Sequence, residues 1–281
     1  MRYFMQLAIA ILIVLPMMGC SSSLKVNSQW RDRDIAIDGN HQEWSGGMTF
    51  FEDDNISLGF FNDAEYLYIS MITANPNIQR QFMTMGFTLW FDPDGGKKRT
   101  FGIKFPVGMW ETGLLMRGRG QRPDLAALRE NFEKSLANIE LIVPGEEEPL
   151  RMRVSEATGI EIKLGDIEER LTYEIRVPLR EDENHPYAIA AKPDKAIGVG
   201  FETAQIDREK MRQQMSGRPG MGGGMGGGRG GSGGGRGGSG GGRGSMGGGR
   251  PQMPEQFKLW VTLQPSTGNQ PSDLVNKNGT R

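Results

Sequence analysis

Residues 55–105 decide the fold, and they read NISLGFFNDAEYLYISMITANPNIQRQFMTMGFTLWFDPDGGKKRTFGIKF. Apolar side chains alternate with other side chains in four segments of this stretch, at 56–60, 67–71, 87–91 and 101–105. Because successive side chains of a strand point to opposite faces, this period predicts four β-strands with one face packed inward. Short polar turns at 62–65 and 92–96 join the strands in pairs, as antiparallel neighbours require.

The same alternation continues on both sides of this stretch. Further segments of this kind lie at 34–38, 139–143, 150–154, 160–164, 171–177, 197–201 and 257–263. This many alternating segments, separated by turn residues, predicts an all-β protein: an antiparallel, jelly-roll-like β-sandwich over residues 30–264. We expect one short helix, which begins at Asp124 after Pro123. Its apolar stripe consists of Leu125, Leu128, Phe132 and Leu136.

Two other stretches are not expected to form a packed core. Residues 216–251 are mostly glycine, and the unit GGGRGGS occurs at 226–232 and again at 233–239. Glycine loses the most entropy on ordering and buries no side chain, so we expect a long disordered loop between two neighbouring strands. The chain tolerates such a loop because closure entropy grows only with the logarithm of its length. Residues 265–281 are polar and show no period, which predicts a flexible tail.

Composition excludes several classes of function. The formal net charge is −1, so we expect no nucleic-acid partner. Cys20 is the only cysteine, and the two histidines, His41 and His185, lie far apart in the sequence. These counts rule out an intrachain disulfide and argue against a histidine metal cluster or a Ser-His-Asp triad. The sequence also has no nucleophile elbow, phosphate loop or His-Glu metal motif, and we therefore expect that the protein is not an enzyme.

The first 19 residues predict a secretory signal peptide. Arg2 precedes an apolar run at 7–18, which is shorter than the roughly 20 residues of a membrane-spanning helix. The run ends in MMGC at 17–20, which resembles the lipobox of bacterial lipoproteins. The commonest lipobox has leucine where Met17 stands here.

This resemblance implies cleavage before Cys20 and attachment of lipid to that residue. Residues 20–29 would then form a polar tether to the membrane. Because Ser21 is not acidic, we expect a lipid-anchored protein of the cell envelope, at the outer membrane rather than the inner one. The alternative is an ordinary secretory signal with an incidental cysteine.

Several short motifs follow one another across residues 30–207. They are IDG at 37–39, EW at 43–44, YLYI at 66–69, FDP at 91–93, YEIRVPL at 173–179 and IGVGF at 197–201. Their order and spacing resemble the family 9 carbohydrate-binding modules and the related DOMON-like β-sandwiches. The resemblance implies a sandwich that binds glycans without catalysis.

Sugar binding needs exposed aromatic rings flanked by polar groups, because a pyranose has an apolar face and hydroxyls at its rim. The tryptophans of this chain are Trp30, Trp44, Trp90, Trp110 and Trp260. Trp44 stands in the family's motif, so we interpret it as structural. Trp110 lies in an irregular stretch beside Glu111 and near Arg117, and of the five tryptophans it is the best placed for a ligand, so these three residues are the candidate ligand-binding site. The alternative is that Trp110 packs against the helix at Asp124.

Two cofactors also come into question. Asp92 and Asp94, followed by Gly95, resemble the opening of a calcium loop, but Ile103 stands where an EF-hand needs glutamate. Related sandwiches hold structural calcium with loop carboxylates, so these two aspartates are a calcium candidate, with a simple hairpin turn as the alternative.

Some relatives of this fold bind haem b through methionine partnered by histidine or lysine. The residues that could take these parts are Met83, Met85, Met109, Met116, Lys104 and His185. The local motifs of those cytochromes are missing, so we expect no haem.

Three functions therefore compete at this point. The first is a lipid-anchored, non-catalytic glycan-binding module. The second is a structural or assembly lipoprotein that docks an envelope protein, with a contact extended by the arginines of the glycine-rich loop, which are Arg229, Arg236, Arg243 and Arg250. The third is a haem-binding electron-transfer domain.

Overall fold

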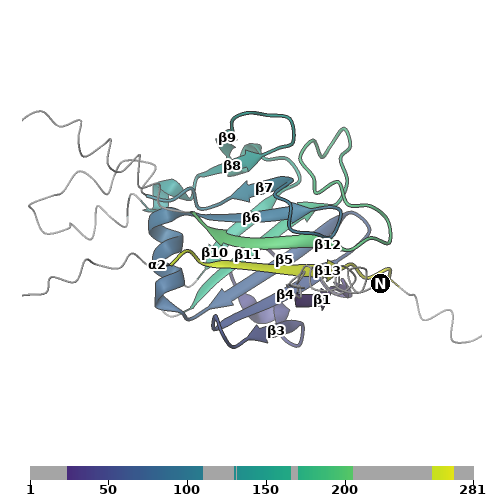
Figure 1. Cartoon of the computed structure of the whole chain (residues 1–281), viewed down its shortest axis with the longest axis horizontal. Helices are drawn as coiled ribbons and strands as arrows, with labels where there is room; N and C mark the ends of the chain where they lie inside the picture. The colour runs from purple at the N-terminus through teal and green to yellow at the C-terminus, as the bar shows by residue number, and fades with distance from the viewer. Residues whose placement is uncertain (1–23, 110–129, 131, 166–169, 205–254, 269–281) are drawn as a thin grey trace, which may run out of the picture.

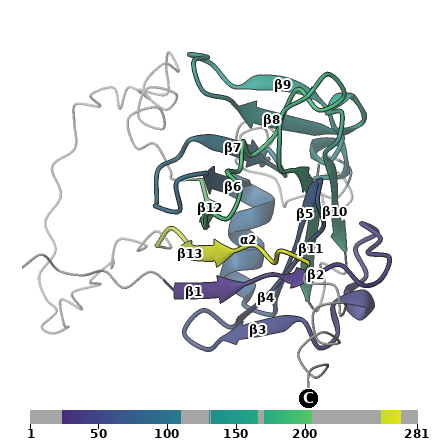
Figure 2. The same ribbon diagram turned by 90° about the vertical axis from the view of Figure 1, so that its right-hand side faces the viewer.

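The computed structural model describes residues 24–109, 130, 132–165, 170–204 and 255–268, and they form a sandwich of two β-sheets (Figures 1 and 2). The first sheet has seven strands in the order β1-β13-β12-β6-β7-β8-β9. Its strands are β1 (Leu24–Asn27), β6 (Phe87–Asp92), β7 (Phe101–Lys104), β8 (Asn138–Ile142), β9 (Leu150–Arg153), β12 (Ile197–Thr203) and β13 (Lys258–Gln264).

The second sheet has six strands, ordered β10-β11-β5-β4-β2, with β3 also paired to β4. Its strands are β2 (Gln29–Trp30), β3 (Met48–Phe51), β4 (Ile56–Asn62), β5 (Tyr66–Thr73), β10 (Glu161–Gly165) and β11 (Leu171–Pro178). The predicted all-β sandwich is confirmed, and most strand pairs are antiparallel. Two pairs are parallel, β1 with β13 and β2 with β4.

The core lies between the two sheets. Phe91 and Val199 come from the seven-stranded sheet and meet Ile69 and Ile175 from the six-stranded one, all completely buried. These residues occupy the alternating positions that the sequence assigns to the inner faces. The two polar turns join antiparallel neighbours as predicted, β4 to β5 and β6 to β7.

The sequence does not predict the helix α2 (Pro76–Met85), which stands at one end of the sandwich (Figure 1). Asn75 caps its first turn by accepting the Asn77 N–H at 3.0 Å, and Pro76 occupies the first turn. Phe82 stacks on Phe87 with ring centroids 4.1 Å apart, so the helix extends the core. Of the helix expected from Asp124, residues 130 and 132–135 are helical and the start lies outside the described residues.

Two local predictions are wrong. Residues 34–38 form no strand: they cross the outer face of the six-stranded sheet, where Ile35 is buried. The polar tether predicted for 20–29 includes β1 and the start of β2, so only its first residues precede the sandwich. β1 reads LKVN and does alternate, but four residues are too few to indicate a strand, and its partner β13 lies more than 200 residues away in sequence.

The strands that flank the predicted loop and the start of the predicted tail belong to the described structure. β12 and β13, which flank the glycine-rich tract, are antiparallel neighbours as expected. The tract itself, residues 216–251, lies outside the described residues. Residues 265–268 of the predicted tail pack on the sandwich, because Ser266 bonds to its interior side chains. Within the described part of the chain, no helix is long and apolar enough to cross a membrane.

Candidate functional site

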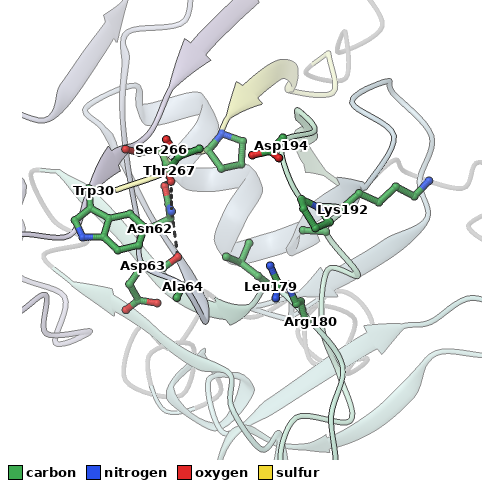
Figure 3. A pocket seen from close by; sticks show the side chains of 13 residues that line it. Trp30, Asn62, Asp63, Ala64, Leu179, Arg180, Lys192, Asp194, Ser266 and Thr267 are labelled. Carbon is green, nitrogen blue, oxygen red and sulfur yellow. Dashed lines mark hydrogen bonds between the residues drawn. The ribbon is translucent and has the colours of Figure 1, made fainter. Parts of the chain in front are cut away.

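A cleft of about 310 Å³ opens at one end of the sandwich, and we name it the Trp30 cleft (Figure 3). Four chain segments that are distant in sequence meet there: the end of β2, the β4–β5 turn, the stretch between β11 and β12, and the residues after β13. Its lining residues are Trp30, Asn62, Asp63, Ala64, Leu179, Arg180, Ala191, Lys192, Pro193, Asp194, Pro265, Ser266 and Thr267.

The side chain of Asn62 links three chain segments at the cleft through hydrogen bonds. Its side-chain oxygen accepts the Ser28 hydroxyl and the Ser266 N–H, the latter at 2.9 Å. Its side-chain nitrogen donates to the carbonyls of Ser266 at 3.0 Å and Asp63 at 3.1 Å. The buried amide therefore has all its hydrogen-bonding capacity engaged within the protein, and its role at the site is to hold the walls in place.

Asp63 is also engaged by the fold. Oδ1 accepts the backbone N–H groups of Glu65 at 2.9 Å and Tyr66 at 2.7 Å, which closes the β4–β5 turn. Oδ2 accepts the Tyr68 hydroxyl at 3.1 Å and pairs with Arg31 Nε at 3.1 Å. Burial, together with the negative charge of Asp63, raises the pKa of Tyr68 to about 12. With four donors on its carboxylate, Asp63 is a structural anchor rather than a free acid or base.

Trp30 forms an exposed wall of the cleft. It is the last residue of β2, paired with Asn62, and 40% of its surface is exposed. The backbone of Gly268 lies against the indole, so close that a Cβ there would come within 2.7 Å of ring carbons. Gly268 has φ of +64°, which also favours glycine at this position. Gly268 thus packs against one side of the indole ring and fixes its orientation, while the remainder of the ring stays accessible to solvent.

Charged side chains from the stretch between β11 and β12 stand across the cleft from Trp30 (Figure 3). Lys192 pairs with the carboxylate of Asp94, and this hydrogen bond lowers the pKa of Asp94. Arg180 and Asp194 are exposed, and neither forms an ion pair with another residue that the structure describes. The loop that carries them is fixed, because the Leu179 N–H donates to the Glu65 carbonyl at 2.7 Å.

The ligand site predicted from the sequence, Trp110 with Glu111 and Arg117, lies outside the described residues, as does Cys20. Trp44 is completely buried, as its structural interpretation requires.

The two remaining tryptophans lie on the outer face of the seven-stranded sheet. Trp90 and Trp260 occupy slots above Gly102 and Gly200, which leave room for their rings. The indole N–H of Trp260 donates to Glu202 at 2.8 Å and only 7% of this residue is exposed, so Trp260 packs as part of the fold.

The two aspartates considered for calcium perform different tasks. Asp92 is buried, and its carboxylate accepts the N–H of Asp94 at 3.1 Å and of Lys98 at 2.8 Å, which closes the β6–β7 turn. Asp94 points to Lys192 instead. Among the described residues, no group of three or more His, Cys, Asp or Glu side chains comes together to hold a metal ion.

The residues considered for haem are spread over the fold. Both ring nitrogens of His185 are engaged, Nε2 with the Tyr66 hydroxyl at 2.7 Å and Nδ1 with Asp182 at 3.0 Å. Lys104 pairs with Glu140 at 3.4 Å on the outer face of the seven-stranded sheet. Met85 and Met109 are buried, Met83 packs on the core, and Met116 lies outside the described residues.

Trp30 is one of five tryptophans, and the sequence around it does not distinguish it as a binding residue. Its surroundings come from segments up to 237 positions away, such as Thr267, and alternation patterns contain no information on such long-range contacts. The local sequence signal for this cleft is the pair of turn-forming residues Asn62 and Asp63 at the end of a buried strand.

No family model and no curated protein sequence matches the chain. Two similar solved structures are of a family 9 carbohydrate-binding module from Caldicellulosiruptor kristjanssonii, one in complex with cellotriose and one with glucose. Each is 9% identical to this chain, with a TM-score of 0.31. The matches cover 66% of this chain and 78% and 80% of the respective neighbours. This distant likeness concerns the fold alone.

Proposed function

We propose that the protein binds a glycan in the Trp30 cleft, without catalysis, and is held at the cell envelope by a lipid on Cys20. The observation that carries the proposal is the exposed indole of Trp30, fixed by Gly268 beside a cleft with charged side chains. Such a ring offers an apolar face for a pyranose, and exposed aromatic rings with a polar rim are typical of carbohydrate sites.

The free polar groups of the cleft fit sugar hydroxyls. Arg180 can donate, Asp194 can accept, and the hydroxyl of Thr267 can do both. The volume of about 310 Å³ lies at the lower end of the range of roughly 300–1,000 Å³ for small-molecule sites, which suits one or two sugar rings. Because Asp63 is saturated with donors, the cleft has no poised pair of carboxylates for hydrolysis.

The test is a glycan array with the full-length protein, followed by calorimetry on any sugar that binds. Trp30→Ala should weaken binding about 30-fold, because truncating a central aromatic anchor costs about 2 kcal/mol. Trp30→Phe should retain a measurable part of the affinity because it keeps an aromatic face.

Trp110→Ala is the matched control, since it removes the tryptophan favoured by the sequence alone. It should leave binding unchanged. A Trp30→Ala variant that binds as well as the parent protein would contradict the assignment of the binding site to the Trp30 cleft. Loss of binding on Trp110→Ala alone would instead assign the site to residues 110–117.

One observation favours the second candidate, an assembly lipoprotein that docks a protein partner. Phe50 is 56% exposed and Leu24 is 46% exposed, on the strands β3 and β1, each an outermost strand of its sheet. Exposed apolar residues on unpaired strand edges are a site for protein association. A blank glycan array, combined with crosslinks from Phe50 to an envelope protein, would favour this function.

A further inference from the structure

Residues 35–47, which we name the cover, lie across the outer face of the six-stranded sheet. The cover lies close to the sheet at two of the sheet's glycines. A Cβ on Gly165 would come within 2.0 Å of the Gly39 carbonyl oxygen, and a Cβ on Gly59 would come within 2.8 Å of the Trp44 ring. The cover therefore touches the sheet backbone at both points.

Between these two contacts lies a buried carboxylate, that of Glu174 on β11. Glu174 is fully buried and alternates with the core residues Tyr173 and Ile175, so it points away from the core and toward the cover. Its Oε2 accepts the Gly39 N–H at 2.8 Å. This bond joins the cover to the centre of the sheet.

Several polar atoms around Glu174 lack a hydrogen bond within the protein. Buried side-chain atoms without a hydrogen bond in the structure include Glu174 Oε1, Ser70 Oγ, Thr172 Oγ1 and Glu43 Oε2. Ser70 is the direct cross-strand neighbour of Glu174, and Thr172 lies two residues earlier on the same face of β11. Unpaired buried polar groups cost free energy, and proteins commonly satisfy them with ordered water.

We propose that the buried polar cluster of Glu174, Ser70 and Thr172 beneath the cover is a hydrated proton-binding site, and that the bound proton stabilises the contact between the cover and the sheet. When Glu174 takes up a proton from solvent, its carbonyl oxygen still accepts the Gly39 N–H. Its new O–H donates to Ser70 or to a bridging water. When Glu174 is ionised, an uncompensated charge is buried beneath the cover.

The charges that face this site favour the protonated form. The pKa of Glu174 is raised to about 7, chiefly by burial and to a smaller extent by the negative charges of Asp38 and Glu43 on the cover. The Gly39 N–H and the nearby Trp44 indole oppose this shift by lowering the pKa.

Three more titratable side chains lie on the same face. Lys163 of β10 is the cross-strand neighbour of Glu174 and is exposed. Arg176 of β11 pairs with Glu161 at 2.8 Å. Tyr68 of β5 keeps its proton because its pKa is raised to about 12.

The direction of the pH effect follows from linkage. Glu174 has an ordinary pKa near 4.5 when unfolded and a raised one when folded. Its proton therefore stabilises the closed cover fully below pH 4.5, and this stabilisation is lost as the pH rises through about 7.

The test is hydrogen exchange of the cover amides in the full-length protein, expressed as protection factors between pH 5.5 and 8.5. Protection of Gly39 and Trp44 should fall about tenfold or more as the pH rises. Glu174→Gln, which mimics the protonated form, should remove this pH dependence. Glu161→Gln is the matched control: it removes a carboxylate from the neighbouring strand and should leave the pH dependence intact.

Flat protection in the parent protein, or parental pH dependence in Glu174→Gln, would overturn the proposal. A second measurement covers the case in which the variant does not fold. The side-chain ¹³C resonance of Glu174 in the parent protein should titrate near pH 7, and a midpoint near 4.5 would refute the site.

Discussion

At the scale of single residues, Asn62 shows how the cleft depends on one buried amide. It bonds to Ser28 and Ser266, which belong to segments at opposite ends of the described chain. Alanine at this position would leave the Ser266 carbonyl and other buried groups with fewer partners, a loss of about 3 kcal/mol. We expect Asn62→Ala to lower the urea midpoint accordingly and to weaken sugar binding, because Ser266 and Thr267 line the cleft.

The exposed Asn184 provides the control for this prediction. Its side chain is at the surface, so Asn184→Ala should change stability by less than about 0.5 kcal/mol. Equal urea midpoints for the two variants would show that the Asn62 network contributes no stability.

At the scale of elements, local pattern predicts the strands well and their less regular neighbours poorly. The long strands β4, β5, β6 and β11 follow from period-2 alternation, since each buries a continuous inner face. β1 has four residues and β2 has two, too few for alternation to indicate a strand, and their parallel partners are distant in sequence. Residues 34–38 pair with no strand in the described part of the chain, and the cover continues into a 3₁₀ helix at His41–Trp44, so alternation at 34–38 misleads. The sequence does not predict the Trp30 cleft either, because four segments that are distant in sequence form the cleft and lie together only in the folded chain.

The glycine-rich tract can be tested at this scale because it connects paired strands. β12 and β13 are in register from Ile197 opposite Leu263 to Glu202 opposite Lys258, so their pairing does not require the tract. Replacing residues 217–250 with a four-residue Gly-Ser linker changes the closure free energy by less than about 1 kcal/mol. We expect a shift of only a few degrees in Tm, measured by circular dichroism.

A large loss of Tm on this replacement would mean that the tract contacts the sandwich. A linker of the same length as the tract, made of glycine and serine without arginine, separates the effect of length from that of the arginines. It should melt like the parent protein.

At the scale of the whole molecule, the short distance from Cys20 to the sandwich matters most. β1 begins at Leu24, so only residues 21–23 separate the proposed lipid from the first strand. Four residue steps span at most about 14 Å when fully extended. A lipid on Cys20 would therefore hold the start of the sandwich close to the membrane surface, and Trp30, ten residues after Cys20, would lie within about 36 Å of the anchored cysteine.

Cys20→Ser tests this arrangement in cells. The variant should lose membrane attachment and remain unprocessed by the lipoprotein signal peptidase, because stable anchoring needs the acyl chains that the cysteine would carry. Fractionation and mass spectrometry of the N-terminus measure both effects. The sandwich itself begins after Cys20, so once solubilised the variant should bind sugar with the affinity of the parent protein. If Cys20→Ser is still cleaved and still sediments with membranes, the anchor is wrong, and the exposed Leu24 and Phe50 become the first candidates for whatever holds the protein there.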